Sequence, residues 1–333
     1  MKKYGNRIEY ISLASVLSAI AVVFLHSNEW ANHFSTSPEW FSANLIHAVF
    51  IFAVPIFFMI SGAMLLDFNK KYDLKTYFTK RINKAVIPYI LWSLFGLIFQ
   101  IYYLNTINVT DVNLTYILTG LATGKLVSIY WFFISLFLLY ISLTIVSRFI
   151  DTKQKCFYAL IITFMINFFL TLHDHHPMVG YLFYSLFGYY VHKYGVNEKT
   201  RKIFYILSAI GFLIILFGTY FLSLNEGKIV IIFRLYNNLP ILFYSTGLFI
   251  LLKYNYHKFM DNEIINKIVS SIEYYTLGIY LVHWYILQVL VKTLNIDITS
   301  LIYRFFSPFI VIPLCVLIIY ILRKIPLVKR SVP

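Results

Sequence analysis

Long apolar runs separated by short polar connections dominate the pattern of this chain. A helix needs about 20 apolar residues to cross the hydrocarbon core of a bilayer. Helices are expected because lipid offers no water to satisfy the open edge of a strand. The pattern therefore predicts a single all-α domain over residues 1–333, an integral membrane protein with about ten transmembrane helices. The predicted spans are residues 9–27, 44–66, 84–104, 129–149, 156–172, 178–193, 203–223, 236–252, 268–291 and 301–322.

Composition excludes a soluble globular protein. The chain is 60% hydrophobic and only 13% charged, whereas soluble domains average about 45–50% apolar and about 25% charged residues. The formal net charge of +14 also has a membrane explanation. Of the 28 Lys and Arg residues, 23 fall in alternate connections and at the chain ends. By the positive-inside rule, this asymmetry predicts that both termini are cytoplasmic. We therefore expect no nucleic-acid partner.

The strongest candidate for chemistry is His26, at the outer end of the first predicted span. A neutral imidazole can take a proton from a hydroxyl group and return it. Glu29 follows three residues later and would orient the ring if the helix continued that far. His47 opens the second predicted span on the same side, where both histidines can share a vestibule. The alternative is that His26 only marks a helix end at the interface.

The second predicted span and its exit combine a helix break with the densest basic cluster of the chain. Pro55 interrupts the apolar run, and the small pair Ser61-Gly62 suits close helix approach. The basic residues Lys80, Arg81 and Lys84 follow. They can hold the phosphates of a nucleotide-like donor through charge-assisted hydrogen bonds. An anchor that contacts anionic lipid explains the same charges.

Other polar residues were weighed as possible sites. The run HDHH at 173–176 resembles a metal site, but four nearly adjacent residues in a short loop cannot all face one ion, and we expect no metal. Cys156 and Cys315 lie in apolar segments and indicate neither a disulfide nor a metal framework. His283 lies deep in the ninth predicted span and needs a hydrogen-bonding partner inside the bundle.

An ordered set of segments resembles one known family. That family is the type-3 acyltransferases, integral membrane enzymes that O-acylate bacterial surface polysaccharides. The match covers most of the chain and looks most like the compact Gram-positive members. The segments are AIAVVFLH at 19–26, FAVPIFFMISGAMLL at 52–66, YFTKRINKAVIPYILWS at 77–93, YWFFISLFLLY at 130–140 and LGIYLVHW at 277–284.

The resemblance implies a function, a location and partners. The donor would be acetyl-CoA or another acyl-CoA, bound from the cytoplasm. The acceptor would be a hydroxyl of a surface polysaccharide or glycolipid outside the bacterial plasma membrane. Membrane lipid is a further expected partner, and a homo-oligomer is possible.

The resemblance also implies roles for individual residues. The family's general base corresponds to His26, and its basic motif corresponds to Lys80 and Arg81, beside the CoA phosphates. The substrate channel is expected to include His47, Ser61, Trp131, Tyr280 and His283.

One departure from the family pattern concerns the first span. The family usually has an arginine eleven residues before the histidine and an aspartate three residues earlier still, where this chain has Ser15 and Ser12. Serine cannot replace the charge of an arginine. This departure keeps two other hypotheses open: an exporter of polysaccharide or lipid-linked sugar, and a catalytically silent membrane partner in envelope synthesis.

Overall fold

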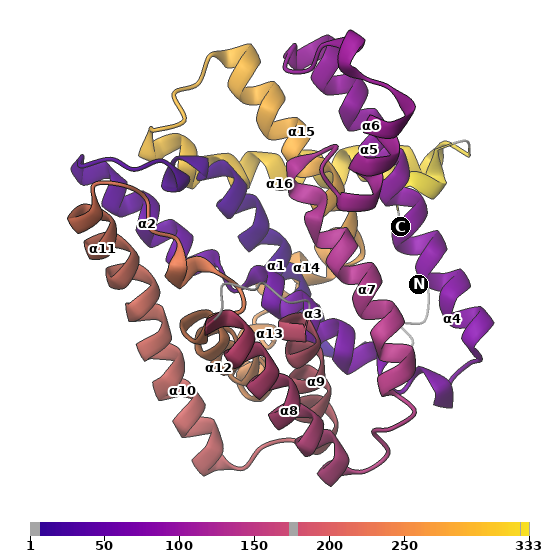
Figure 1. Cartoon of the computed structure of the whole chain (residues 1–333). Helices are drawn as coiled ribbons and strands as arrows, with labels where there is room; N and C mark the ends of the chain where they lie inside the picture. The colour runs from indigo at the N-terminus through magenta and orange to yellow at the C-terminus, as the bar shows by residue number, and fades with distance from the viewer. Residues whose placement is uncertain (1–6, 173–178, 327, 333) are drawn as a thin grey trace.

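A computed structural model describes residues 7–172, 179–326 and 328–332 (Figure 1). These residues form helices joined by turns and short loops, with no β-strand among them, which confirms the predicted all-α class. The helices are α1 (Glu9–Ser27), α2 (Pro38–Phe50), α3 (Ala53–Leu65), α4 (Leu74–Arg81), α5 (Ile87–Phe99), α6 (Leu114–Thr123), α7 (Trp131–Val146), α8 (Lys153–Leu172), α9 (Val179–Tyr194), α10 (Glu198–Leu213), α11 (Thr219–Glu226), α12 (Leu239–Asn255), α13 (His257–Met260), α14 (Glu263–Ile272), α15 (Thr276–Leu294) and α16 (Leu301–Lys324).

Eight helical stretches in the described part of the chain are long and apolar enough to cross a membrane. Four of them join consecutive helices into stretches of 29 to 33 residues, which extend beyond the predicted spans. The other two predicted spans correspond to α8 and α9, apolar helices of 20 and 16 residues beside positions 173–178, and are not among the eight. The eight are Glu9–Ser27, Pro38–Lys70, Leu74–Leu104, Ser128–Val146, Glu198–Glu226, Ile232–Asn255, Glu263–Leu294 and Leu301–Lys324.

Helix α1 lies at the centre of the bundle and packs against α2, α3, α12, α15 and α16 (Figure 1). Its neighbour α3 also packs closely on α9. A Cβ atom at Gly62 would lie 1.8 Å from the Ser185 carbonyl oxygen, and one at Gly188 would lie 2.1 Å from the Met59 carbonyl oxygen. Glycine is therefore required at both contacts, as expected where two membrane helices approach backbone to backbone.

The break predicted at Pro55 separates α2 from α3. Helix α2 ends at Phe50, and α3 begins at Ala53, two residues before the proline. Proline lacks an N–H, so it is tolerated in the first turn of a helix, where that group has no intrahelical partner. The break allows α2 and α3 to present side chains to the same interior space from different angles.

The beginning of α1 and the end of α16 meet at the same end of the bundle. Arg7 forms a 3.1 Å ion pair with Glu273, and the guanidinium of Arg323 lies 4.7 Å from the ring centre of Tyr275. Both contacts involve the 3₁₀ turn η9 (Glu273–Tyr275). We call this the basic end of the bundle and the opposite end, where α1 stops after His26, the histidine end. A common side for the two chain ends agrees with the topology prediction, while the cytoplasmic orientation stays a prediction.

Candidate active site

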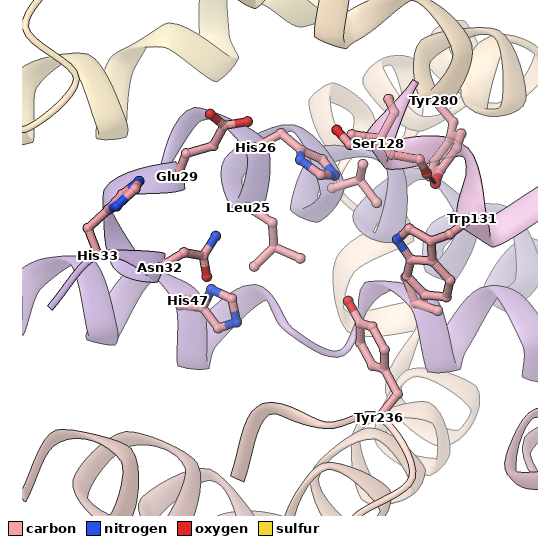
Figure 2. Close-up of a pocket in the computed structure, with 13 residues that line it drawn as sticks. Leu25, His26, Glu29, Asn32, His33, His47, Ser128, Trp131, Tyr236 and Tyr280 are labelled. Atoms are coloured by element: carbon pink, nitrogen blue, oxygen red, sulfur yellow. Dashed lines mark hydrogen bonds between the residues drawn. The ribbon is translucent and has the colours of Figure 1, made fainter. Parts of the chain in front are cut away.

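A cavity of about 310 Å³ lies at the histidine end (Figure 2). The C-terminal turn of α1 forms one wall, and the 3₁₀ turn η1 (Glu29–Asn32) continues it. Side chains from α2, α3, α7 and α15 complete the enclosure. Besides His26 and Glu29, three residues expected to line a substrate channel lie in this lining: His47 from α2, Trp131 from α7 and Tyr280 from α15. None of Lys80, Arg81 and Lys84 lines it. The lining residues are Val22, Leu25, His26, Glu29, Asn32, His33, His47, Val54, Ser128, Ile129, Trp131, Tyr236 and Tyr280.

Three histidines, His26, His33 and His47, line this cavity. His26 and His47 both line it, so the predicted shared vestibule is confirmed. Both ring nitrogens of His47 are buried and have no hydrogen-bond partner. Such groups are costly to bury unless a ligand or water satisfies them. The cavity therefore presents imidazole nitrogens that are free to bind a polar ligand.

His283 lies behind His26 rather than in the cavity lining. It is completely buried, and its ring centre is 5.1 Å from that of His26. Its Nδ1 lies 2.9 Å from the Ile279 carbonyl oxygen. A carbonyl can only accept a hydrogen bond, so Nδ1 carries the proton, and Nε2, which has no partner, keeps its lone pair. The hydrogen-bonding partner expected for His283 is thus the backbone of its own helix.

Aromatic rings form a second wall of the cavity. Trp131, at the start of α7, stacks on Tyr236 with ring centres 5.7 Å apart and planes inclined by 29°. Tyr181 of α9 also packs against Trp131, with ring centres 6.3 Å apart. Figure 2 shows Trp131 and Tyr236 on the side of the cavity opposite His33 and Glu29. A flat aromatic wall facing several polar groups suits a ligand with both apolar faces and hydroxyl edges.

Glu29 reaches the cavity from η1 and not from an extension of α1, because α1 ends at Ser27. The carboxylate and His26 line the same space without sharing a helix face. Burial raises the pKa of the Glu29 carboxyl above its ordinary value, and the nearby His33 opposes that shift. Glu29 and His26 line the same cavity, which is compatible with the prediction that Glu29 orients His26. That role stays a prediction.

Arg304 holds the backbone just beyond His26. This arginine of α16 is completely buried. Its Nη1 lies 3.3 Å from Asn28 Oδ1, its Nη2 donates to Ser42 Oγ over 2.9 Å, and its guanidinium lies 5.2 Å from the ring centre of Trp30. The side chain of Asn28 in turn donates to the Ala43 carbonyl over 2.8 Å. These bonds tie the end of α1 to α2.

Arg234 also holds the connection between α1 and α2 in place. It ends the 3₁₀ turn η8 (Ile232–Arg234), is only 7% exposed, donates to the Ala31 carbonyl over 2.8 Å and also bonds Asn44 Oδ1. Sequence analysis missed the roles of both arginines. The available signal was that they are two of five basic residues outside the predicted cytoplasmic connections, in segments otherwise poor in charge.

A smaller cavity of about 130 Å³ lies between this site and the basic end. Tyr280 lines both cavities and separates them, and its hydroxyl donates to the Ile129 carbonyl. We call the two spaces the outer and inner cavities. Ser61, predicted to line a channel, lies in the inner cavity. The inner cavity is lined by Ser15, Phe57, Ile60, Ser61, Phe132, Leu136, Tyr140, Thr276, Leu277 and Tyr280.

The predicted donor-binding cluster adjoins this inner cavity through Tyr140. Arg81 ends α4, and its guanidinium lies 5.7 Å from the ring centres of both Tyr77 and Tyr140. Its Nε is buried and has no hydrogen-bond partner. The ammonium group of Lys80 lies 4.0 Å from the ring centre of Tyr72. Lys84, in the π-helical turn that joins α4 to α5, is exposed.

The two serines that depart from the family pattern have polar neighbours. The hydroxyl of Ser15 lies 3.2 Å from that of Thr276 and faces the inner cavity. Arg7 Nε lies 3.4 Å from Ser12 Oγ and 3.1 Å from Glu273 Oε2, and Arg7 Nη2 is buried without a partner. A charge pair therefore stands beside Ser12, although neither charge comes from α1 itself.

No group of three His, Cys, Asp or Glu residues that could hold a metal occurs within residues 7–172, 179–326 and 328–332. The HDHH run begins at the first of positions 173–178, outside the described residues. The expectation that no metal binds therefore stays a prediction.

Comparison with known proteins gives the family. No curated protein and no solved structure matches the chain. The model of the acyltransferase 3 family, described as an acyltransferase domain, matches residues 8–322, nearly the whole chain. That range contains both cavities, the basic cluster and every candidate site residue. The chain therefore belongs to the acyltransferase 3 family and is a multi-pass membrane acyltransferase.

Proposed function

We propose that this protein transfers an acyl group, most simply acetyl, from a cytoplasmic acyl-CoA to a hydroxyl of an extracytoplasmic surface glycan or glycolipid in the bacterial plasma membrane. One observation carries this proposal: the inner and outer cavities share Tyr280, His26 lines the outer cavity, and Arg81 lies against Tyr140 of the inner cavity. A donor held at one end can thus meet an acceptor held at the other.

The basic end suits the charged part of the donor. CoA carries phosphates, which arginine binds through paired N–H groups and lysine binds as a point charge. Arg81 has a buried Nε without a partner, and Lys80 and Lys84 lie on the same or the next turn. In this account, the narrow pantetheine arm passes Tyr140 into the inner cavity, while the nucleotide stays outside the bundle.

Arg7 can supply the cation that this chain lacks at the position of the family's first-helix arginine, where it has Ser15. Its unpartnered Nη2 can donate to an anionic or carbonyl oxygen of the donor, while Glu273 and Ser12 fix the rest of the guanidinium. Replacement of the first-helix arginine by Ser15 is therefore compatible with activity. This role favours an enzyme over a catalytically silent partner.

The histidine end suits proton transfer and acceptor binding. His26 would take the proton of the acceptor hydroxyl as its oxygen attacks the thioester carbonyl. The C–S bond then breaks, and His26 returns the proton to the leaving CoA thiolate. Glu29 would orient the ring, and the stacked Trp131 and Tyr236 would support the sugar. Direct attack of the acceptor hydroxyl on the thioester needs no covalent acyl-enzyme and is the simpler route.

The test of this proposal is acetyl-CoA consumption by purified protein in lipid vesicles, with acceptor present. Wild-type protein should release CoA, and His26→Ala should bind acetyl-CoA without releasing CoA. Protein that is folded and binds acetyl-CoA but never releases CoA with any acceptor would contradict the proposal. Transport of acceptor without CoA release would instead favour an exporter.

A further inference from the structure

A third cavity, of about 540 Å³, lies at the basic end, away from the acyl-transfer site. Its lining residues come from α8, α9, α10 and α12 and from the turn before α10. None of its lining residues lines the inner or outer cavity. We call it the α8–α10 groove. The lining residues are Lys153, Phe157, Leu160, Phe187, Tyr190, Tyr194, Gly195, Val196, Asn197, Thr200, Phe204 and Tyr254.

The lining changes from polar to apolar along the direction of the helices. On α8, Lys153 at the helix start is followed by Phe157 and Leu160 at helical spacing, deeper in the bundle. The neighbouring α10 repeats this order with Thr200 and Phe204. The groove therefore has a polar mouth at the membrane interface and an apolar part at the depth of the lipid chains.

Two cations lie at the polar mouth, Lys153 in its lining and Arg201 against the lining ring of Tyr254, and Glu198 contributes negative charge near Arg201. Within the part of the chain that the structure describes, the nearby acids pair with other lysines: Asp151 with Lys155 at 2.9 Å and Glu198 with Lys202 at 2.8 Å. Among the described residues, the close partner of Lys153 is the ring of Tyr190, 6.0 Å away.

Arg201 is the second of these cations. Its guanidinium stacks 4.4 Å above the ring centre of Tyr254, whose hydroxyl hydrogen-bonds the backbone of Val196. The Nε of Arg201 is buried without a hydrogen-bond partner. Buried donors without partners indicate a missing acceptor. The mouth thus combines positive charge with a free donor, which matches a phosphate group.

We propose that the α8–α10 groove binds an anionic phospholipid, with its phosphate at Lys153 and Arg201. One acyl chain would lie along Phe157, Leu160 and Phe204. Basic pockets between transmembrane helices at the interface bind anionic headgroups in this way. The half-exposed Phe157 places the groove's flank on the lipid-facing surface, which gives a membrane lipid direct access. The proposal does not depend on the acyl-transfer reaction.

The test compares lipids on purified protein in neutral detergent. Phosphatidylglycerol should raise the melting temperature of wild type more than phosphatidylcholine does, and native mass spectrometry should detect the bound lipid. The double variant Lys153→Gln/Arg201→Gln should bind phosphatidylglycerol about 10-fold to 30-fold more weakly. The control Lys155→Gln/Lys199→Gln removes the same charge from the same two helices and should retain wild-type affinity.

Two further arms distinguish the sources of the phosphate. Inorganic phosphate should give no shift at the concentration at which the lipid saturates, because it lacks the acyl chain. A shift from inorganic phosphate as large as that from the lipid would overturn the lipid assignment. Equal loss of affinity in both double variants would reduce the effect to general surface charge and would also overturn it. Phe157→Ser, which keeps the cations, should weaken lipid binding and so keeps the proposal testable if the double variant fails to fold.

Discussion

The histidine end and the basic end of this bundle use arginine in opposite ways. At the histidine end, Arg304 and Arg234 are buried and direct their N–H groups at protein oxygens. At the basic end, Arg81 and Arg201 lie against tyrosine rings, and each keeps a buried Nε without a partner. The first pair builds the site, while the second pair has donors left for a ligand. Residue type alone therefore does not reveal the role, and the hydrogen-bond partners do.

The largest effect is expected at the histidine end, on catalysis. His26→Ala removes the proposed base, and loss of general base catalysis typically costs about 10²–10⁴-fold in rate. The measurement is CoA release in vesicles at equal protein level. His33→Ala is the matched control, since His33 lines the same cavity without the proposed catalytic role, and should retain most of the rate. Comparable rates for the two variants would remove His26 from the mechanism.

The second effect separates structural from ligand-binding arginines. Arg304→Gln leaves Asn28 and Ser42 without their buried partner, and such groups cost about 1–3 kcal/mol each. We expect a clearly lower melting temperature and a reduced rate. Arg304→Lys should not restore stability, because a lysine lacks the planar fork that reaches both oxygens. Lys228→Gln, at an exposed position, should change stability by less than about 0.5 kcal/mol. An unchanged melting temperature for Arg304→Gln would show that Arg304 does not hold this loop.

The third effect concerns the basic end, where we expect a loss of ligand binding with little loss of stability. Lys80→Gln/Arg81→Gln should keep the melting temperature within a few degrees of wild type and weaken acyl-CoA binding about tenfold or more, because two charge-assisted bonds to phosphate are lost. Binding by wild type should also weaken as salt rises. Loss of stability without loss of affinity would assign Arg81 to the structural group with Arg304.

The smallest effect concerns pH. Burial raises the pKa of Glu29, so its carboxylate is lost on acidification at a higher pH than the ordinary value of about 4.3. If the carboxylate orients His26, the rate should fall as pH falls through that raised pKa. Glu29→Gln should remove this fall in rate at low pH, which is the acidic limb of the pH–rate profile. Its maximum rate should be lower than that of wild type. Because His33 lowers the pKa of Glu29, His33→Ala should move the limb to higher pH. An acidic limb that persists in Glu29→Gln would belong to another group.

Sequence predicted the parts of this molecule that depend on local pattern. The spans follow from runs of apolar residues, and the placement of His26 at a helix end follows from the length of the first run. The shared vestibule of His26 and His47 follows from topology, since both lie at the same end of adjacent spans. The close helix contact at Gly62 follows from residue size.

The remaining features depend on residues that are far apart in the chain. Arg304 meets Asn28 across 276 positions, and Arg7 meets Ser270 across 263. The inner cavity needs side chains from α1, α3, α7 and α15 at once. Nothing in a single sequence fixes such distances. The end of α1 at Ser27 agrees with the predicted span of residues 9–27, and Glu29 lies beyond the helix in η1.

The most direct test of the two-ended account is acetyl-CoA affinity, measured by thermal shift on wild type, His26→Ala and Lys80→Gln/Arg81→Gln. Donor at about 100 times its Kd should stabilise wild type by about 2.7 kcal/mol. The account predicts the same shift for His26→Ala and about 1.4 kcal/mol or less for the double variant, whose Kd should be at least tenfold higher. A shift that is lost in His26→Ala but kept in the double variant would contradict the account, as would folded wild type that never responds to acyl-CoA.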